Sequence, residues 1–195
     1  MFSFWLQGML ERLRSRRDRL LFRWHTSDKG HFGFGAMMLV PVTALGFLVQ
    51  FARSDHIERQ AAGMRQRDLR CLAENVYHEA RGEPLRGQHA VAEVTLNRVA
   101  SDEFPATVCE VVFEQRLDVQ RRRYVGAFSW TELDRLRRPH GDAWQLALEV
   151  ATAAYDGQEP GVVPDALYYH ADAIEPRWAG EKQVVATIGN HIFYR

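Results

Sequence analysis

Two glutamates, Glu79 and Glu83, stand four residues apart in the stretch VYHEARGE, and His78 directly precedes the first of them. A glutamate shielded from water can act as a general acid, whereas a histidine next to a glutamate on a helix can belong to a zinc site. The helical zinc pattern requires a second histidine four residues after the first, and Gly82 occupies that position. Since the sequence also lacks a CxxC pair and a phosphate-binding glycine loop, we expect no metal site and no cofactor.

The predicted place of Glu79 at the end of a helix makes it the stronger candidate for an acid. Apolar residues before it follow helical spacing, Asp68 can cap the start, and Gly82 followed by a proline can stop the helix, which predicts a helix over residues 68–80. The negative end of the helix dipole and neighbouring apolar side chains would both raise the pKa of Glu79, as a general acid near neutral pH requires. The alternative is that both glutamates are solvated charges, and we expect Glu83 to be the more exposed of the two.

The rest of the pattern predicts a mainly helical α+β domain with a small C-terminal β-sheet. The expected elements, in chain order, are a helix at 88–99, a helix after Ser101-Asp102 with Pro105 in its first turn, a basic loop at 116–124, a helix at 142–155, strands at 166–171 and 183–188, and a tight hairpin around Gly189-Asn190.

Charge and composition exclude one class of function. The 195 residues contain 25 basic and 25 acidic side chains, so the formal net charge is zero, and 46% of the residues are hydrophobic. A nucleic-acid-binding domain usually carries a basic excess, so we expect no nucleic acid partner. The length suits one folded domain with an additional segment.

The additional segment is N-terminal. Residues 1–31 are rich in arginine, and residues 32–52 contain no Asp, Glu, Lys or Arg, which predicts a helix that spans a membrane core of ~30 Å. The polar residues 53–67 are expected to link this span to a folded domain at 68–195. The excess of positive charge before the span favours a cytoplasmic N-terminus, and hence a domain in the periplasm or cell envelope. The small residues around Ala44-Leu45-Gly46 leave a cleaved signal peptide as an alternative.

The two cysteines of the chain, Cys71 and Cys109, both follow the predicted span. An exported domain permits a disulfide between them, and two buried free thiols are the alternative. Their number and spacing also argue against a zinc site built from thiolates.

Short motifs follow one another from residue 71 to the C-terminus. They are Tyr77-His78-Glu79-Ala80-Arg81-Gly82-Glu83-Pro84, Gly87-Gln88, Ala90-Val91-Ala92, Leu96-Asn97-Arg98-Val99, Pro105-Ala106-Thr107-Val108-Cys109, Phe128-Ser129-Trp130, Ala166-Leu167-Tyr168-Tyr169-His170, Trp178 and Ile188-Gly189-Asn190-His191-Ile192-Phe193-Tyr194-Arg195. In this order the set resembles the SleB/CwlJ-type cell-wall hydrolase family, which includes spore-cortex lytic enzymes. The resemblance implies a lysozyme-like domain that acts on the glycan strands of peptidoglycan.

The family's catalytic acid maps to the first glutamate of its E-A-R-G-E motif, which is Glu79 here. The resemblance implies a lytic transglycosylase that cuts the MurNAc-β-1,4-GlcNAc bond. The acid protonates the leaving oxygen, and the C6 hydroxyl of the same muramic residue attacks to give a 1,6-anhydro end. This reaction needs no second carboxylate, in agreement with the lack of a convincing second acid in the sequence. Hydrolysis by a muramidase that uses the same acid is the alternative.

Four further residues are expected in the substrate cleft, namely Gln88, Ser129, Tyr168 and His191. Aromatic residues in predicted loops and strand ends are typical of a carbohydrate site. The family commonly has a glutamine directly before Phe128, but this chain has Ala127 there, preceded by Gly126. The departure favours a further alternative, a membrane-tethered glycan-binding or scaffold protein with weak catalysis.

Overall fold

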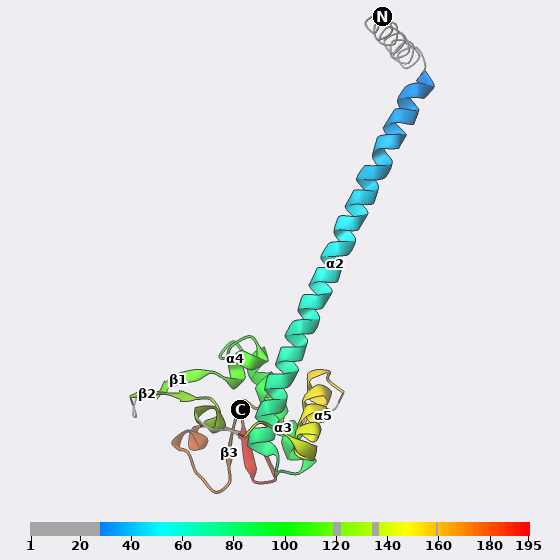
Figure 1. Ribbon diagram of the computed structural model, residues 1–195. Coiled ribbons are helices and arrows are strands. Elements are labelled where there is room, and N and C mark those ends of the chain that lie inside the picture. The colour runs from blue at the N-terminus through cyan, green and yellow to red at the C-terminus, as the bar shows by residue number, and fades with distance from the viewer. Residues whose placement is uncertain (1–27, 119–121, 134–136, 159) are drawn as a thin grey trace, which may run out of the picture. The chain divides into compact units, whose positions relative to one another are not determined.

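The structure is a computed structural model that describes part of the chain. Its backbone is described for residues 28–118, 122–133, 137–158 and 160–195, and its side chains within these ranges from residue 43 onward, apart from Asp118. Two compact units are present, one ending at Gln60 and the other spanning Ala61–Arg195. Figure 1 shows the helices and strands of the described residues.

The first described element is helix α2, Asp28–Ala80, which continues for 53 residues. The predicted helix start at Asp68 is therefore wrong. Residues 53–67, expected as a linker or membrane-proximal stalk, are helical. These residues contain no proline, and their Arg, Gln, Glu and Ala side chains favour helix. An i,i+4 ion pair between Asp55 and Arg59, at 2.6 Å, adds to this preference.

The end of α2 agrees with the prediction. The helix stops at Ala80, and the backbone N–H of Glu83 donates to the Ala80 carbonyl at 2.9 Å. Asp68 lies inside the helix, where its carboxylate accepts a hydrogen bond of 3.4 Å from the Tyr155 hydroxyl. Asp68 therefore joins α2 to a neighbouring helix and does not cap a helix start.

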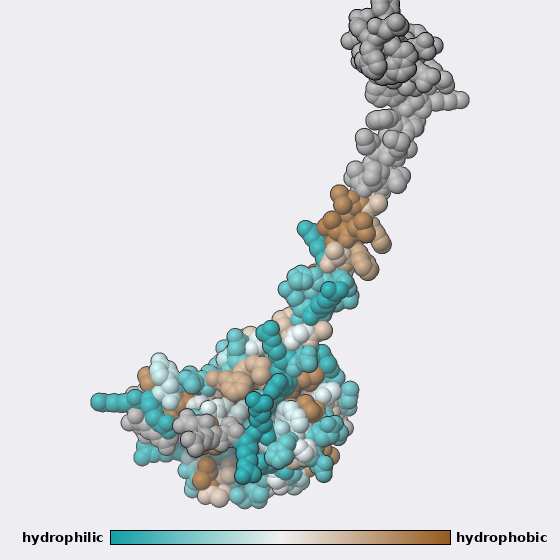
Figure 2. Space-filling model, viewed as in Figure 1, coloured by the Kyte–Doolittle hydropathy of each residue, from teal (hydrophilic) through white to brown (hydrophobic). Residues whose placement is uncertain are grey.

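The predicted membrane span, residues 32–52, falls within α2, and its side chains before residue 43 lie outside the described residues. Beyond that point Leu45, Phe47 and Phe51 are each more than half exposed. Figure 2 shows this apolar section of the helix in brown. Among the residues that the structure describes, no helix is long and apolar enough to cross a membrane. The basic segment 1–31 lies outside the described residues, except for the backbone of its last four.

The C-terminal unit combines the end of α2 with short helices and two small antiparallel sheets (Figure 1). The helices are α3 (Leu85–Ala100), α4 (Val108–Val112), α5 (Gly141–Tyr155) and the 3-10 helices η1 (Ser129–Glu132) and η2 (Arg177–Glu181). The strands are β1 (Gln115–Asp118) and β2 (Arg123–Gly126) in one sheet, and β3 (Tyr168–Ala171), β5 (His191–Tyr194) and β4 (Val184–Ile188), in that order, in the other. This arrangement confirms the predicted mainly helical α+β domain with a small C-terminal sheet.

The helices predicted at 88–99 and 142–155, both C-terminal strands and the hairpin between β4 and β5 are confirmed, with boundaries shifted by a few residues. Gly189 in this hairpin has a φ of +58°, a left-handed conformation that favours glycine.

A helix was predicted with Pro105 in its first turn, and this predicted start is wrong. Helix α4 begins at Val108, because Thr107 caps it by accepting the Glu110 N–H on its side-chain oxygen at 3.3 Å.

Where the structure describes the segment 116–124, at residues 116–118 and 123–124, it is strand and not the expected loop. Arg116 pairs with Val125, and Leu117 pairs with Tyr124, in the antiparallel ladder of β1 and β2. Leu117, Tyr124 and Val125 have side chains that favour strands, whereas the count of arginines alone suggested a loop.

Helix α3 is packed on two sides by apolar clusters. One cluster joins the end of α2, α4, α5 and the η1 segment, and the other joins α3 to β4, β5 and the segment before β3. Between the helices, Asn75 accepts a hydrogen bond of 3.0 Å from the Trp130 indole and donates one of 3.1 Å to the Thr95 hydroxyl. Because all three groups are buried and paired, they fix the η1 segment against the last turns of α2.

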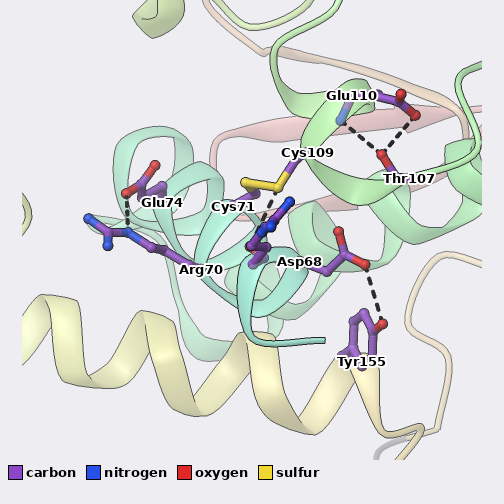
Figure 3. Close-up of a disulfide and its surroundings, with 9 residues drawn as sticks. Asp68, Arg70, Cys71, Glu74, Thr107, Cys109, Glu110 and Tyr155 are labelled. Carbon is purple, nitrogen blue, oxygen red and sulfur yellow. Dashed lines mark hydrogen bonds and ion pairs between the residues drawn. A yellow bond between two sulfur atoms is a disulfide. The ribbon is translucent and has the colours of Figure 1, made fainter. Parts of the chain in front are cut away.

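A disulfide between Cys71 and Cys109 ties α2 to α4 (Figure 3), with an S–S distance of 2.09 Å. Of the two alternatives that the sequence left open, the structure therefore has the disulfide. The bond holds the start of α4, and hence the approach to β1, against α2.

Candidate active site

The C-terminal unit contains a cleft of about 490 Å³ that is lined by residues of α2, α3, β1, η1, β3, η2 and β5 and of the segments between them. The residues that line it are Glu79, Arg98, Phe104, Glu114, Arg116, Ala127, Ser129, Tyr168, Tyr169, His170, Ala171, Ile174, Pro176, Trp178 and His191. The fold thus brings together, in one hollow, a carboxyl group of the VYHEARGE motif, two arginines, a second carboxylate and several aromatic rings.

Glu79 lies in the last turn of α2, and its carboxyl group is largely buried. Its Oε2 accepts a hydrogen bond of 3.0 Å from the Tyr169 hydroxyl. Burial raises the pKa of Glu79, while the Tyr169 hydrogen bond and the charge of Arg98 act in the opposite direction. The predicted raised pKa is confirmed, with burial as its main cause. Because the tyrosine donates to Oε2, the proton of the neutral acid resides on Oε1, where it can be transferred to a breaking bond.

Tyr169 is held in place by strand pairing and ring contacts. It pairs with Phe193 in the β3–β5 ladder, and its ring lies 5.5 Å from the Phe193 ring and 5.3 Å from the His191 ring. Burial and the neighbouring charge of Glu79 raise the pKa of Tyr169 well above its ordinary value. The hydroxyl therefore keeps its proton at neutral pH and acts as a donor to Glu79.

Arg98 is the buried cation of the cleft, with 8% of its surface exposed. Its Nε donates to the Leu167 carbonyl at 2.8 Å, and its guanidinium lies 5.1 Å from the ring centroids of both Phe104 and Phe128. These contacts offset part of the cost of burying a charge. Arg98 thus provides a fixed positive charge beside the acid.

Three of the four residues expected in the substrate cleft line it, namely Ser129, Tyr168 and His191. The Tyr168 hydroxyl donates to Glu103 at 3.2 Å, and its ring lies 5.8 Å from the Trp178 ring. Tyr168 and Trp178 therefore present adjacent aromatic surface to the cleft, as a sugar-binding site requires.

Gln88, the fourth residue expected in the substrate cleft, does not line it. The side chain is buried, with 4% exposure, and its Nε2 donates to the Glu83 carbonyl at 3.1 Å. The physical reason is its position in the first turn of α3, on the face that packs against the chain leading out of α2. Gln88 supports the turn of the motif and does not contact the hollow.

Glu83 is buried, although the sequence suggested that it would be the more exposed glutamate. Only 9% of its side chain is exposed, and its carboxylate accepts hydrogen bonds from the Asn190 backbone N–H at 2.9 Å and the Asn190 side chain at 3.1 Å. A Cβ on Gly189 would overlap Glu83 Oε2 and lie 2.9 Å from Pro84 Cδ. Glu83 therefore anchors the β4–β5 hairpin to the turn after α2 and is a structural carboxylate.

The two histidines that could have served a metal have other surroundings. His170 contacts the Ala171 carbonyl at 2.9 Å and the Tyr194 hydroxyl at 2.8 Å through its two ring nitrogens. His191 Nδ1 is buried and has no hydrogen-bond partner within the described part of the chain. It lies 3.8 Å from Glu83, and burial lowers the pKa of His191. Within the described side chains, no three His, Cys, Asp or Glu residues are grouped so that they could hold a metal ion.

The sequence did not identify Arg98, Tyr169, Glu114 or Arg116 as site residues. One signal was available for Arg98, because it follows Val91 and Val94 at helical spacing and so places a charge on the buried face of α3. Tyr169 is not distinguishable from Tyr168 by sequence. Glu114 directly precedes β1, and no motif or spacing in the sequence indicates that this residue lines the cleft.

This chain differs from the expected motif at Gly126 and Ala127, and local packing accounts for the glycine. A Cβ on Gly126 would overlap Thr131 Oγ1 and lie 3.1 Å from the Phe128 carbonyl oxygen, so this turn accepts only glycine there. Ala127 lines the cleft, and its N–H donates to the Glu114 carbonyl at 2.8 Å.

Comparison with known proteins supplies the family. The family model described as Cell Wall Hydrolase matches residues 82–194, beginning three residues after Glu79. The spore cortex-lytic enzyme of Bacillus cereus is 37% identical over 133 residues, which are 67% of this chain and 45% of that protein. This chain therefore spans less than half the length of that curated relative.

Two solved structures are also similar. The catalytic domain of the Bacillus cereus SleB protein is 34% identical, with a TM-score of 0.49, over 67% of this chain and 91% of that chain. The catalytic domain of the germination-specific lytic transglycosylase SleB from Bacillus anthracis is also 34% identical, with a TM-score of 0.48, over 67% of this chain and 95% of that chain. On the extent of the family match and the identity to its curated relative, this chain belongs to the cell wall hydrolase family.

Proposed function

We propose that this chain cleaves the glycan strands of peptidoglycan at the MurNAc-β-1,4-GlcNAc bond, as a lytic transglycosylase with a lysozyme-like catalytic domain. The observation that carries the proposal is the buried carboxyl group of Glu79, whose pKa is raised and whose Oε2 is held by Tyr169. The family and the name of the curated relative, a spore cortex-lytic enzyme, support a wall polymer as the substrate.

In the first step, Glu79 donates its Oε1 proton to the oxygen of the glycosidic bond. The C1–O bond breaks, the GlcNAc alcohol leaves, and positive charge develops on the muramic C1 and ring oxygen. The carboxylate that Glu79 has become is stabilised by the Tyr169 hydrogen bond and by the charge of Arg98. The two groups therefore stabilise the product of proton transfer while burial keeps the reactant acid neutral.

In the second step, the Glu79 carboxylate accepts the proton of the muramic C6 hydroxyl, and the C6 oxygen bonds to C1. The acid is regenerated, and the product ends in a 1,6-anhydro ring. One carboxyl group thus performs both proton transfers. The surroundings of Glu114 support this scheme, since one of its oxygens is paired with Arg116 at 2.8 Å and the other is buried.

Hydrolysis is the second candidate, and the presence of Glu114 in the same cleft favours it. Glycosidases that use water commonly place two carboxyl groups around the bond, one as acid and one as base or nucleophile. If Glu114 turned its buried oxygen toward the substrate, it would be able to serve as that second group.

Product analysis separates these candidates. Purified sacculi are digested with the wild-type chain and with Glu79→Gln, and the muropeptides are identified by mass spectrometry. We expect 1,6-anhydro muramic ends with the wild type and none with the variant. Reducing muramic ends in their place would establish the muramidase, and binding to sacculi without any release of fragments would establish a glycan-binding protein.

We further propose that the domain acts outside the cytoplasm, tethered to the cytoplasmic membrane through residues 32–52. The uncharged sequence of that segment and the Cys71–Cys109 disulfide, which forms in oxidising compartments, support this location. Membrane fractionation followed by protease treatment of intact spheroplasts tests it, since release of a soluble C-terminal fragment is expected only from an externally exposed domain.

A further inference from the structure

Glu114 is a second carboxylate in the cleft, and its surroundings are unusual. Its side chain is 16% exposed, and its Oε1 accepts a hydrogen bond of 2.8 Å from Arg116 Nε. Its Oε2 is buried and has no hydrogen-bond partner among the described residues. Since almost all buried polar atoms in native proteins are paired, a carboxylate kept in this state indicates a role that packing alone does not explain.

Two arginines of the cleft share one aromatic ring. The guanidinium of Arg98 lies 5.1 Å from the Phe104 centroid, and that of Arg116 lies 4.5 Å from it. Two cations on the same ring repel each other, and Arg98 is almost fully shielded from water, which makes the repulsion stronger. The carboxylate of Glu114 is the negative charge that is bonded to this pair, through Arg116.

We propose that Glu114 is a positioning residue for Glu79: its carboxylate offsets one of the two positive charges of the Arg98–Arg116 pair and so adds to burial in keeping the acid protonated. The inference rests on the proposed function of Glu79 and deepens it, because it explains how an acid can stay neutral beside two arginines. Glu114 acts through the arginines and makes no contact with the reacting atoms.

The charges around Glu79 give the direction of the effect. The titratable and charged groups that share the cleft with Glu79 are Arg98 of α3, Glu114 before β1, Arg116 of β1, Tyr168, Tyr169 and His170 of β3, and His191 of β5. The charge of Arg98 lowers the pKa of Glu79, and Glu114 and Arg116 act on Arg98 with opposite signs. Removal of the Glu114 charge leaves both arginines without compensation. Glu79 then loses its proton at a lower pH.

The test is the pH profile of kcat/KM on purified sacculi for three variants, Glu114→Gln, Glu114→Gln with Arg116→Gln, and Glu149→Gln. At high pH, kcat/KM falls as Glu79 loses its proton, and this fall is the alkaline limb of the profile. For Glu114→Gln we expect the alkaline limb to lie about one pH unit lower, so that above it kcat/KM is about tenfold below that of the wild type. The double variant removes one charge of each sign and is expected to restore most of the shift. Glu149 is an exposed residue of α5, and its variant is expected to keep the wild-type profile.

Two results would overturn the inference. An equal loss of rate at every pH, without movement of the limb, would show a merely structural role for Glu114. A loss as complete as that of Glu79→Gln would show that Glu114 is itself a catalytic carboxylate.

A second readout does not depend on turnover. The carboxyl carbon of Glu79, in protein labelled with ¹³C-glutamate and assigned with Glu79→Gln, is titrated by NMR in the wild type and in Glu114→Gln. A lower midpoint in the variant is expected, and an unchanged midpoint contradicts the inference. If the wild type fails to cleave sacculi, the proposed function fails, while this titration still decides whether Glu114 controls the protonation of Glu79.

Discussion

The Tyr169 hydroxyl donates to Glu79 Oε2 at 3.0 Å, joining two residues 90 positions apart in the chain. Glu79 comes from the last turn of α2, and Tyr169 comes from the first strand of the C-terminal sheet. The orientation of the acid is therefore set by the sheet as well as by the helix that carries it. Any change that moves β3 against α2 is expected to change the proton transfer.

Replacement of Tyr169 by phenylalanine is expected to move the pH profile in the direction opposite to that of Glu114→Gln. The hydrogen bond lowers the pKa of Glu79, so its loss raises that pKa further and moves the alkaline limb of kcat/KM to higher pH. The maximal rate is expected to fall about tenfold, because the carboxylate formed in the reaction loses a donor. Tyr168→Phe is the matched control, since its hydroxyl donates to Glu103 and leaves the limb in place. A downward shift for Tyr169→Phe would contradict this account.

Replacement of Glu79 by glutamine is expected to abolish cleavage while leaving the fold intact. General acid catalysis contributes about 10²–10⁴ to such rates, so the loss is expected to exceed about 100-fold. The measurement is release of soluble muropeptides, with circular dichroism and sacculus binding as controls for folding. Cleavage at rates near those of the wild type would show that another residue supplies the proton.

The same variant is expected to change how stability depends on pH. The folded-state pKa of Glu79 is raised above its ordinary value of 4.5, so its contribution to stability is fully present below that value and is lost as pH rises through the folded pKa. The Glu79→Gln variant has no titrating group at this position. Its free energy of unfolding, compared with that of the wild type, is therefore expected to increase between pH 4 and pH 8. Urea unfolding at both pH values measures the difference, and a constant difference would argue that Glu79 is not desolvated.

Replacement of Glu83 by alanine is expected to affect stability more than chemistry. The variant loses two hydrogen bonds to Asn190 from a buried carboxylate, which is worth about 2–3 kcal/mol of the free energy of unfolding. Because Glu83 holds the hairpin that carries His191, KM is expected to rise while the pH limb stays in place. Chemical unfolding gives the free energy of unfolding, and kinetics on the same preparation give KM and its pH profile. Glu175→Ala, at an exposed site, is the control.

Loss of the disulfide is expected to destabilise the C-terminal unit. Cys71 and Cys109 are 38 positions apart, and the chain-entropy relation gives about 4 kcal/mol for a loop of this size. Unfolding of the Cys71→Ser, Cys109→Ser double variant measures the loss. Reduction of the disulfide in the wild type is expected to cause the same loss of stability. A double variant as stable as the oxidised wild type would show that α4 is held by packing alone.

Local elements of this chain follow from local sequence, and the errors occur where a distant contact or a single cap decides. The end of α2 at Ala80, helices α3 and α5, and the β4–β5 hairpin are set by apolar spacing, a stop signal after Ala80 and a glycine turn. The start of α4 depends on one Thr107 side chain, and the β1–β2 ribbon depends on pairing between two short strands that are individually weak signals.

The candidate site divides in the same way. The sequence by itself placed Glu79 at a helix end, with the ordered motifs of a cell-wall hydrolase after it, because motif order and helix spacing are properties of the chain. Only the tertiary structure decided that Glu79 meets Tyr169, that Arg98 and Glu114 share its cleft, and that Gln88 does not. The physical reason is that burial and electrostatic pairing depend on which distant segments pack together. Burial, the Tyr169 hydroxyl of β3 and the charge of Arg98 of α3 set the protonation of the Glu79 carboxyl group, and the spacing of these residues in the sequence does not give their distances.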